Sequence, residues 1–151
     1  MRKTVHILVG GVGTGKSTFA NKLSHREGIK AISGDDIQTK NSHLTDDAID
    51  ELTDEAVESC IRNEESFIVD GKHLNTRNRH GIISKCKKEG YRILGYNFGE
   101  GDVTSLLRRK NQPRNTSGEE WEEIHKMDSE SFNEPDPAEG FDRIFYPPFN
   151  L

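Results

Sequence analysis

A glycine-rich segment near the N-terminus has the residue types and the spacing that are needed to hold a chain of phosphates. Residues 10–18 read GGVGTGKST, which fits the pattern G-x-x-x-x-G-K-[ST]. Its glycines let the backbone curl so that successive N–H groups point inward at phosphate oxygens. A helix that we expect to begin at about Lys16 adds the positive end of its dipole. The segment therefore predicts a phosphate-binding loop for a nucleoside triphosphate.

Two side chains of this loop have specific expected roles. Lys16 is expected to reach the β- and γ-phosphates of ATP, and Ser17 is expected to give its hydroxyl to Mg²⁺. The structural alternative is a strand-to-helix turn without a ligand, but such a turn does not need glycines, a Lys and a Ser in this order. The residues expected to bind ATP are Gly11, Gly13, Thr14, Gly15, Lys16, Ser17 and Thr18.

Carboxylates follow two further expected strands. Asp35 and Asp36 come directly after the strand predicted at 29–33, at the sheet edge where ligands bind in this architecture. We expect Asp35 to accept the proton of an acceptor hydroxyl and Asp36 to contact the substrate. Asp70 ends the apolar strand 67–70 and is expected to bind Mg²⁺ through water. The alternatives are that the Asp pair caps the next helix and that Asp70 only forms a turn.

A basic loop is the candidate lid over the phosphates. Residues 108–118 are polar and contain three arginines and a proline. Such a loop can fold over a transferring phosphoryl group and offset its developing charge, and we expect Arg109 and Arg114 to do so. An ordinary exposed basic loop is the alternative.

The elements that must position these residues alternate between strands and helices. The continuous apolar run at 5–9 is typical of a buried parallel strand. This alternation predicts an α/β fold in which a mostly parallel β-sheet is flanked by helices on both faces, in one domain over residues 1–151. The other predicted strands are 29–33, 67–70, 91–98 and 141–146, and the predicted helices are 16–26, 45–63, 76–89, 103–110 and 118–132.

Composition narrows the classes of protein further. No stretch approaches the roughly 18 apolar residues of a membrane-spanning helix, so we expect a cytoplasmic protein that does not bind a membrane. Cys60 and Cys86 have no second ligand at metal-binding spacing, and we expect reduced thiols. The net charge is −5, but residues 71–117 carry 11 Lys/Arg against 3 Asp/Glu. A polyanion would meet this local basic surface, unless these residues only solvate helix faces. The sequence leaves the oligomeric state open.

A triphosphate loop by itself does not say where the phosphoryl group goes. A GTPase normally has an N-K-x-D segment, which is absent from this sequence. A motor ATPase often has Asp-Glu at a strand end, whereas Asp70 is followed by Gly71. A small kinase needs an acidic base near the acceptor and a basic lid, and this chain has candidates for both. The sequence thus favours transfer from ATP to a hydroxyl.

Several segments together match the pattern of a known family, and they are residues 10–18, 32–36, 68–70 with Arg79, 107–114, 132–135 and 138–142. Through these residues the chain resembles the kinase domain of polynucleotide 5′-kinases and the small P-loop kinases related to them. The resemblance implies a P-loop kinase fold with a helical or loop lid. It also implies that Asp35 is the general base and that Lys16, Ser17, Thr18 and the lid arginines clamp the phosphates.

Three departures from the pattern of this family fall on the acceptor side. Gly34 stands where an Arg often precedes the Asp pair, and Gln38 stands where a basic residue can contact the acceptor's phosphate. The turn that reads D-T-N or N-T-N in the family is Gly71-Lys72-His73 here. We hypothesise that Lys72 and His73 take over an acceptor-phosphate contact, and we count Arg79 among the substrate-binding residues.

Several acceptors remain open for this reason. The leading hypothesis is the 5′-hydroxyl of a DNA or RNA end, with nucleic acid as the partner. A second hypothesis is the hydroxymethyl group of a modified pyrimidine, which would have to leave the base stack. A third is a small hydroxyl metabolite or nucleoside. A nucleotide-binding protein without transfer is the alternative from another class, and the presence of Asp35 and the lid arginines argues against it.

Overall fold

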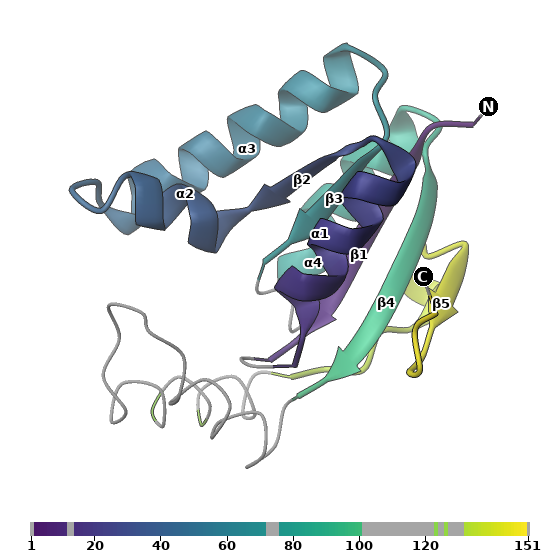
Figure 1. Cartoon of the computed structure of the whole chain (residues 1–151). Coiled ribbons are helices and arrows are strands. Elements are labelled where there is room, and N and C mark those ends of the chain that lie inside the picture. Colours follow the sequence, from purple (N-terminus) through teal and green to yellow (C-terminus); the bar gives the residue numbers. More distant parts are fainter. Residues whose placement is uncertain are drawn as a thin grey trace.

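In the computed structural model, the strands form one parallel sheet and helices connect them (Figure 1). The structure describes residues 2–11, 14–71, 76–100, 123, 126 and 132–150. The strand order is β2-β3-β1-β4-β5, and each neighbouring pair is parallel. The predicted α/β architecture is therefore confirmed. The strands are β1 Thr4–Gly10, β2 Lys30–Ser33, β3 Phe67–Asp70, β4 Arg92–Gly99 and β5 Arg143–Phe145.

The helices lie on both faces of the sheet (Figure 1). The predicted lid at 108–118 and the predicted helix 103–110 lie outside the described residues, and of the predicted helix 118–132 only Glu123, Lys126 and Phe132 are described. The described helices are α1 Lys16–Glu27, α2 Gly34–Lys40, α3 Asp46–Arg62, α4 Thr76–Lys88 and the short 3₁₀ helix η1 Pro137–Glu139.

Two apolar clusters hold these layers together. Alternate side chains of β1 point to opposite faces, as the period of a strand requires. Val5, Ile7 and Val9 belong to the cluster under α3 and α4, and Leu8 belongs to the cluster under α1. Burial on both faces explains why the central strands read as continuous apolar runs. Among the described residues, no helix is long and apolar enough to cross a membrane.

The C-terminal strand is shorter than expected. β5 covers three residues instead of the predicted 141–146, because the two residues before it make other contacts. The Asp142 carboxylate accepts a hydrogen bond from the Ile93 amide at 2.7 Å, and the Asp142 amide donates to the Ile93 carbonyl at 2.8 Å. The ring of Phe141 turns into the core, where it is 5% exposed. The chain thus docks on β4 before the regular ladder starts.

A packed histidine lies in the middle of β1. The His6 Nδ1 atom and the Tyr96 hydroxyl are 2.9 Å apart, and the two rings stack at a centroid distance of 5.8 Å. Burial lowers the pKa of His6 from 6.5 to about 4, with Glu27 opposing and Arg92 adding to this shift. The imidazole is therefore neutral in the folded protein at neutral pH.

We expect the Gly95→Ala substitution to destabilise the fold by about 1–3 kcal/mol. A Cβ at Gly95 would lie 2.7 Å from Cε1 of Phe141, so the ring that docks the tail would have to move. Urea unfolding measures this loss. Gly81→Ala is the matched control, because nothing lies within 4 Å of its Cβ. A Gly95→Ala protein as stable as the wild type would contradict this packing.

We also expect stability to fall with pH between about 6.5 and 4 because of His6. Its pKa is lower in the folded state, so the unfolded state binds more protons in this range. Proton binding therefore stabilises the unfolded state relative to the folded state as the pH falls. The wild type should lose about 1–2 kcal/mol relative to His6→Gln between pH 7.5 and pH 5. Unfolding curves at several pH values measure the difference. Parallel stability profiles of the two proteins would contradict a buried neutral imidazole.

Candidate functional site

The entry to the glycine-rich loop is held against the end of β4. The Gly11 amide donates to the Gly99 carbonyl at 2.9 Å. A Cβ at Gly10 would meet Phe98 Cβ at 2.7 Å and the Gly99 oxygen at 3.0 Å. Only glycine fits here, because the backbones of β1 and β4 approach so closely. Packing against β4 therefore requires a glycine at the first position of the motif, independently of any ligand.

The start of α1 has the features that an anion-binding helix end needs. Gly15 precedes the helix with a φ of 96°, a left-handed conformation that favours glycine, and it makes no side-chain cap. Thr14 turns its hydroxyl back to the Gly11 carbonyl at 2.8 Å. The first turn of α1 contains no acidic residue. No carboxylate of the first turn itself therefore opposes an anion at the positive end of the helix dipole.

Lys16 joins the loop to the end of β3. Its ammonium donates to the Gly10 carbonyl at 2.7 Å and to the Gly71 carbonyl at 3.3 Å. Gly10 ends β1 and Gly71 directly follows β3, and these two strands are parallel neighbours in the sheet. The cation therefore lies at the carboxyl edge of the sheet, where the loop, β1 and β3 meet.

Asp70 brings a buried carboxylate to the same place. It ends β3 and is 6% exposed. Burial raises its pKa above the ordinary value, while the charge of Lys16 and a hydrogen bond from Ser17 oppose this effect. Asp35 and Asp36 raise the pKa of Asp70 further through charge repulsion. The structure thus brings Lys16, Ser17 and Asp70 together and sets the Asp pair within electrostatic range.

The Asp pair lies in the first turn of α2 with both residues exposed. β2 pairs Ser33 with Asp70 of β3, so residues just beyond Ser33 come near that carboxylate. The helix is capped by the Ser33 hydroxyl, which accepts from the Asp36 amide at 3.2 Å. Capping is therefore not the role of Asp35 or Asp36, and both carboxylates face solvent at the edge of the sheet.

The oxygen atoms of Ser17 and Asp70 suit a magnesium ion better than a metal that is bound by protein side chains alone. Mg²⁺ is usually bound by one or two protein oxygens together with water and substrate phosphates. Ser17 and Asp70 supply a hydroxyl and a carboxylate in contact with each other. Within the part of the chain that is described, no group of three or more His, Cys, Asp or Glu could hold a metal ion.

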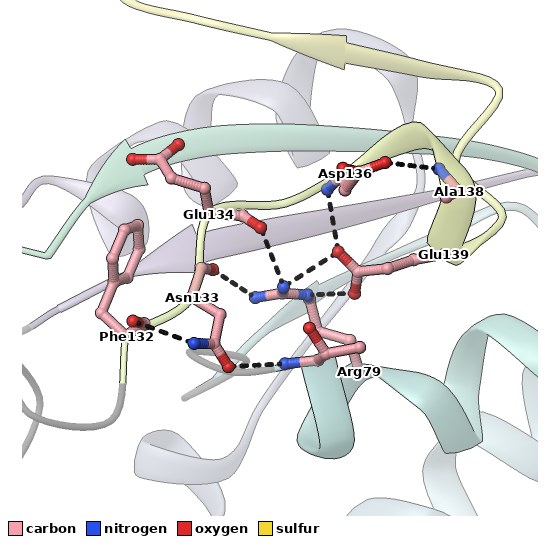
Figure 2. Close-up of polar contacts among 8 residues, drawn as sticks. Arg79, Phe132, Asn133, Glu134, Asp136, Ala138 and Glu139 are labelled. Carbon is pink, nitrogen blue, oxygen red and sulfur yellow. Dashed lines mark hydrogen bonds and ion pairs between the residues drawn. The ribbon is translucent and has the colours of Figure 1, made fainter.

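Arg79 lies elsewhere than expected. It is 0% exposed, and its Nε and Nη2 atoms donate to the two carboxylate oxygens of Glu139 at 2.8 and 3.0 Å (Figure 2). Its Nη1 atom donates to the Asn133 carbonyl at 3.1 Å. These contacts give Arg79 a role in holding the segment 132–139, and the substrate contact expected from the sequence stays a prediction. Local patterns did not reveal this pair, because its members are 60 positions apart.

Five predicted site residues lie outside the described residues, and their roles stay predictions. They belong to the glycine-rich loop, to the turn after β3 and to the basic loop. They are Gly13, Lys72, His73, Arg109 and Arg114.

Comparison with known proteins identifies the fold. No family model and no curated protein matches this sequence. The structure of Kti12 from Chaetomium thermophilum in complex with ADP-AlF3 is similar, with a TM-score of 0.65, 15% identity, and coverage of 94% of this chain and 87% of that chain. A sugar kinase from Janibacter sp. HTCC2649 has a TM-score of 0.63 and 13% identity, with coverage of 95% and 85%.

A third similar structure belongs to the PezAT toxin-antitoxin system of Streptococcus pneumoniae. Its TM-score is 0.61 at 16% identity, with coverage of 72% of this chain and 52% of that chain. This chain therefore spans about half the length of that protein. The chain has the P-loop kinase fold, and at these identities the likeness establishes the fold alone.

We expect Asp70→Asn to raise the free energy of unfolding at pH 7 by about 0.5–2 kcal/mol. A carboxyl whose pKa is raised in the folded state costs stability wherever it is ionised, and the cost disappears as the pH falls towards 3.8. Urea unfolding at pH 7 and pH 4 measures both effects. Asp46→Asn is the control, because Asp46 is exposed and does not contribute to the pKa shift of Asp70, and it should change stability by less than about 0.5 kcal/mol. A less stable Asp70→Asn protein would contradict the dominance of burial.

Proposed function

We propose that this protein is an ATP-dependent phosphotransferase that moves the γ-phosphate of ATP to a hydroxyl group, with the 5′-hydroxyl of a DNA or RNA end as the acceptor. The observation that carries the proposal is the meeting of Lys16, Ser17 and Asp70 at the sheet edge where α2 presents Asp35. In this proposal Lys16 contacts the phosphates, Ser17 and Asp70 bind the metal ion, and Asp35 is the base.

The donor side would work through charge and position. The amides of the loop and of the first turn of α1 would hold the phosphates, and Lys16 would turn from the Gly10 and Gly71 carbonyls to their oxygens. Ser17 and Asp70 would hold Mg²⁺, which would supply neutralisation of the phosphate charge. Arg109 and Arg114 are proposed to offset the charge that develops during transfer.

The acceptor side would use Asp35 as the general base. Its carboxylate is exposed in the first turn of α2, just after β2, the strand next to β3, so an acceptor hydroxyl would approach it in line with the bound phosphate. Asp36 follows directly and would contact the acceptor. Support for a nucleic-acid acceptor comes from the resemblance to polynucleotide 5′-kinases and from the basic composition of residues 71–117.

A small, uncharged or cationic hydroxyl compound is the second candidate, and one observation favours it. The helix α3, which follows α2, has a strongly acidic exposed surface that would repel a polyanion near Asp35. The similarity to a sugar kinase agrees with this candidate. The exposed acidic residues are Asp46, Asp47, Asp50, Glu51, Asp54 and Glu55.

Transfer of label from γ-labelled ATP with Mg²⁺ to a panel of acceptors tests the proposal. The panel contains 5′-hydroxyl DNA, 5′-hydroxyl RNA, a 5′-blocked duplex with hydroxymethyl pyrimidines, and nucleosides with sugars. Label on the 5′-hydroxyl oligomers alone would support the whole proposal. Label only on the blocked duplex or only on small molecules would keep the donor site and overturn the acceptor. A protein that binds no ATP would overturn the donor site as well.

We expect Asp35→Asn to lower the transfer rate by about 10²–10⁴-fold, because an amide cannot take the hydroxyl proton. ATP affinity, measured by calorimetric titration, should stay nearly unchanged. Asp46→Asn is the matched control, since Asp46 is also an exposed aspartate in the first turn of a helix. Unimpaired turnover of Asp35→Asn would remove Asp35 as the base.

A further inference from the structure

The tail segment 132–139 is fixed to α4 by a buried ion pair. The Arg79 and Glu139 side chains are 0% and 9% exposed and meet through two parallel hydrogen bonds. Glu139 also accepts from the Asp136 amide at 2.8 Å, and Asp136 accepts from the Ala138 amide at 2.8 Å (Figure 2). A carboxylate with this many partners holds the guanidinium, and with it the tail, in one position.

The same guanidinium sets the direction of two further tail residues. Arg79 donates to the Asn133 carbonyl at 3.1 Å and to the Glu134 carbonyl at 3.5 Å. In Figure 2 the Glu134 carboxylate points away from Arg79. The Asn133 side chain accepts from the Thr76 amide, the first of α4, at 3.4 Å. The tail therefore contacts the start of α4 while it presents Glu134 towards β4.

From Glu134 a chain of hydrogen bonds runs to the phosphate-binding loop. The Asn97 Nδ2 atom donates to Glu134 Oε2 at 2.6 Å, and Asn97 Oδ1 accepts from the Gly99 amide at 2.9 Å. The Gly99 carbonyl accepts from the Gly11 amide at 2.9 Å. We name Glu134, Asn97, Gly99 and Gly11 the Asn97 relay.

The backbone at the relay is irregular in a way that needs support. Val9 pairs with Asn97 and Gly10 with Gly99, so Phe98 is an extra residue on β4. Gly99 has a φ of 84°, in the left-handed region. A bulge followed by such a glycine has many alternative conformations, and the ladder alone does not select one. Asn97 is 6% exposed, and both the Nδ2 and the Oδ1 atom of its side chain make a hydrogen bond. These two bonds favour the observed conformation of the backbone at Gly99.

We propose that Glu134 and Asn97 are positioning residues for the phosphate-binding loop. Without the Glu134 carboxylate, the buried Nδ2 of Asn97 would lose its partner and the side chain would turn to find another. Gly99 would then lose its restraint, and the Gly11 amide would lose a fixed acceptor. A loop that is less preorganised binds phosphate more weakly, because more conformational freedom is lost on binding. The link to nucleotide binding rests on the proposed function.

The tail offers a matched control at the other end of β4. Asp142, which follows the tail segment, resembles Glu134 in being exposed and in accepting one hydrogen bond from β4 through its carboxylate. Its donor is the Ile93 amide, at the start of the strand and far along it from the loop. Removing either carboxylate affects tail docking, but only Glu134 belongs to the relay.

Hydrogen exchange of peptide 9–19 without nucleotide tests the relay directly, with peptide 66–71 of β3 as the reference for global unfolding. We expect Glu134→Ala to speed exchange of peptide 9–19 about fivefold or more relative to this reference. Glu134→Gln keeps an oxygen for Asn97 and should exchange like the wild type. Asp142→Ala should leave the ratio of the two peptides unchanged. In calorimetric titrations, Glu134→Ala should weaken ATP binding about three- to tenfold, and the other two variants should not.

Equal exchange ratios in Glu134→Ala and Asp142→Ala would overturn the relay, as would failure of Glu134→Gln to restore the wild-type ratio. If the wild type binds no ATP, the proposed function fails, and the exchange comparison still decides on the relay. Faster exchange in the loop with unchanged ATP affinity would overturn the positioning role in binding.

Discussion

The parallel pairing of β3 with both β1 and β2 is the arrangement on which the candidate site depends. β3 pairs Asp70 with Leu8 on one side and with Ser33 on the other. Because the chain leaves all three strands at one edge, the loop after β1, the carboxylate of β3 and the helix after β2 meet there. Residues far apart in the sequence thereby become neighbours, and Lys16, Ser17 and Asp70 meet beside the loop with Asp35 nearby.

Charge gathered at this edge works against stability. Burial and the nearby Asp35 and Asp36 raise the pKa of Asp70, so its ionised form is disfavoured without a cation in reach. Lys16 relieves part of this cost and is itself held by two backbone carbonyls. A buried acid with a specific charge partner, next to a glycine-rich loop at a helix start, is typical of a functional site rather than of a core built for stability alone.

Part of the charge pattern along the sequence serves packing between helices. Lys85 of the basic α4 donates to Glu58 of the acidic α3 at 2.8 Å, and this hydrogen bond lowers the pKa of Glu58. Neither residue is then available to a distant ligand, although an exposed pair of this kind contributes little to stability. The net charge of residues 71–117 therefore overstates the basic surface that a polyanion would meet. The charge that an acceptor meets therefore depends on the acidic surface of α3 as well as on the basic residues of α4.

The sequence by itself determined the strands, most helix ends and the glycine-rich loop, because these follow from local patterns: apolar periodicity, capping residues such as Thr45, and the spacing of glycines before Lys16. It also indicated Asp35 and Asp70, because one comes just after a strand and the other ends one. Only the tertiary structure decided which residues meet across the chain. It closed Arg79 on Glu139, capped α2 with Ser33, shortened β5 through Asp142, and joined Gly11 to Gly99. Such contacts depend on how the strands are ordered in the sheet, and no spacing within a single segment encodes that order.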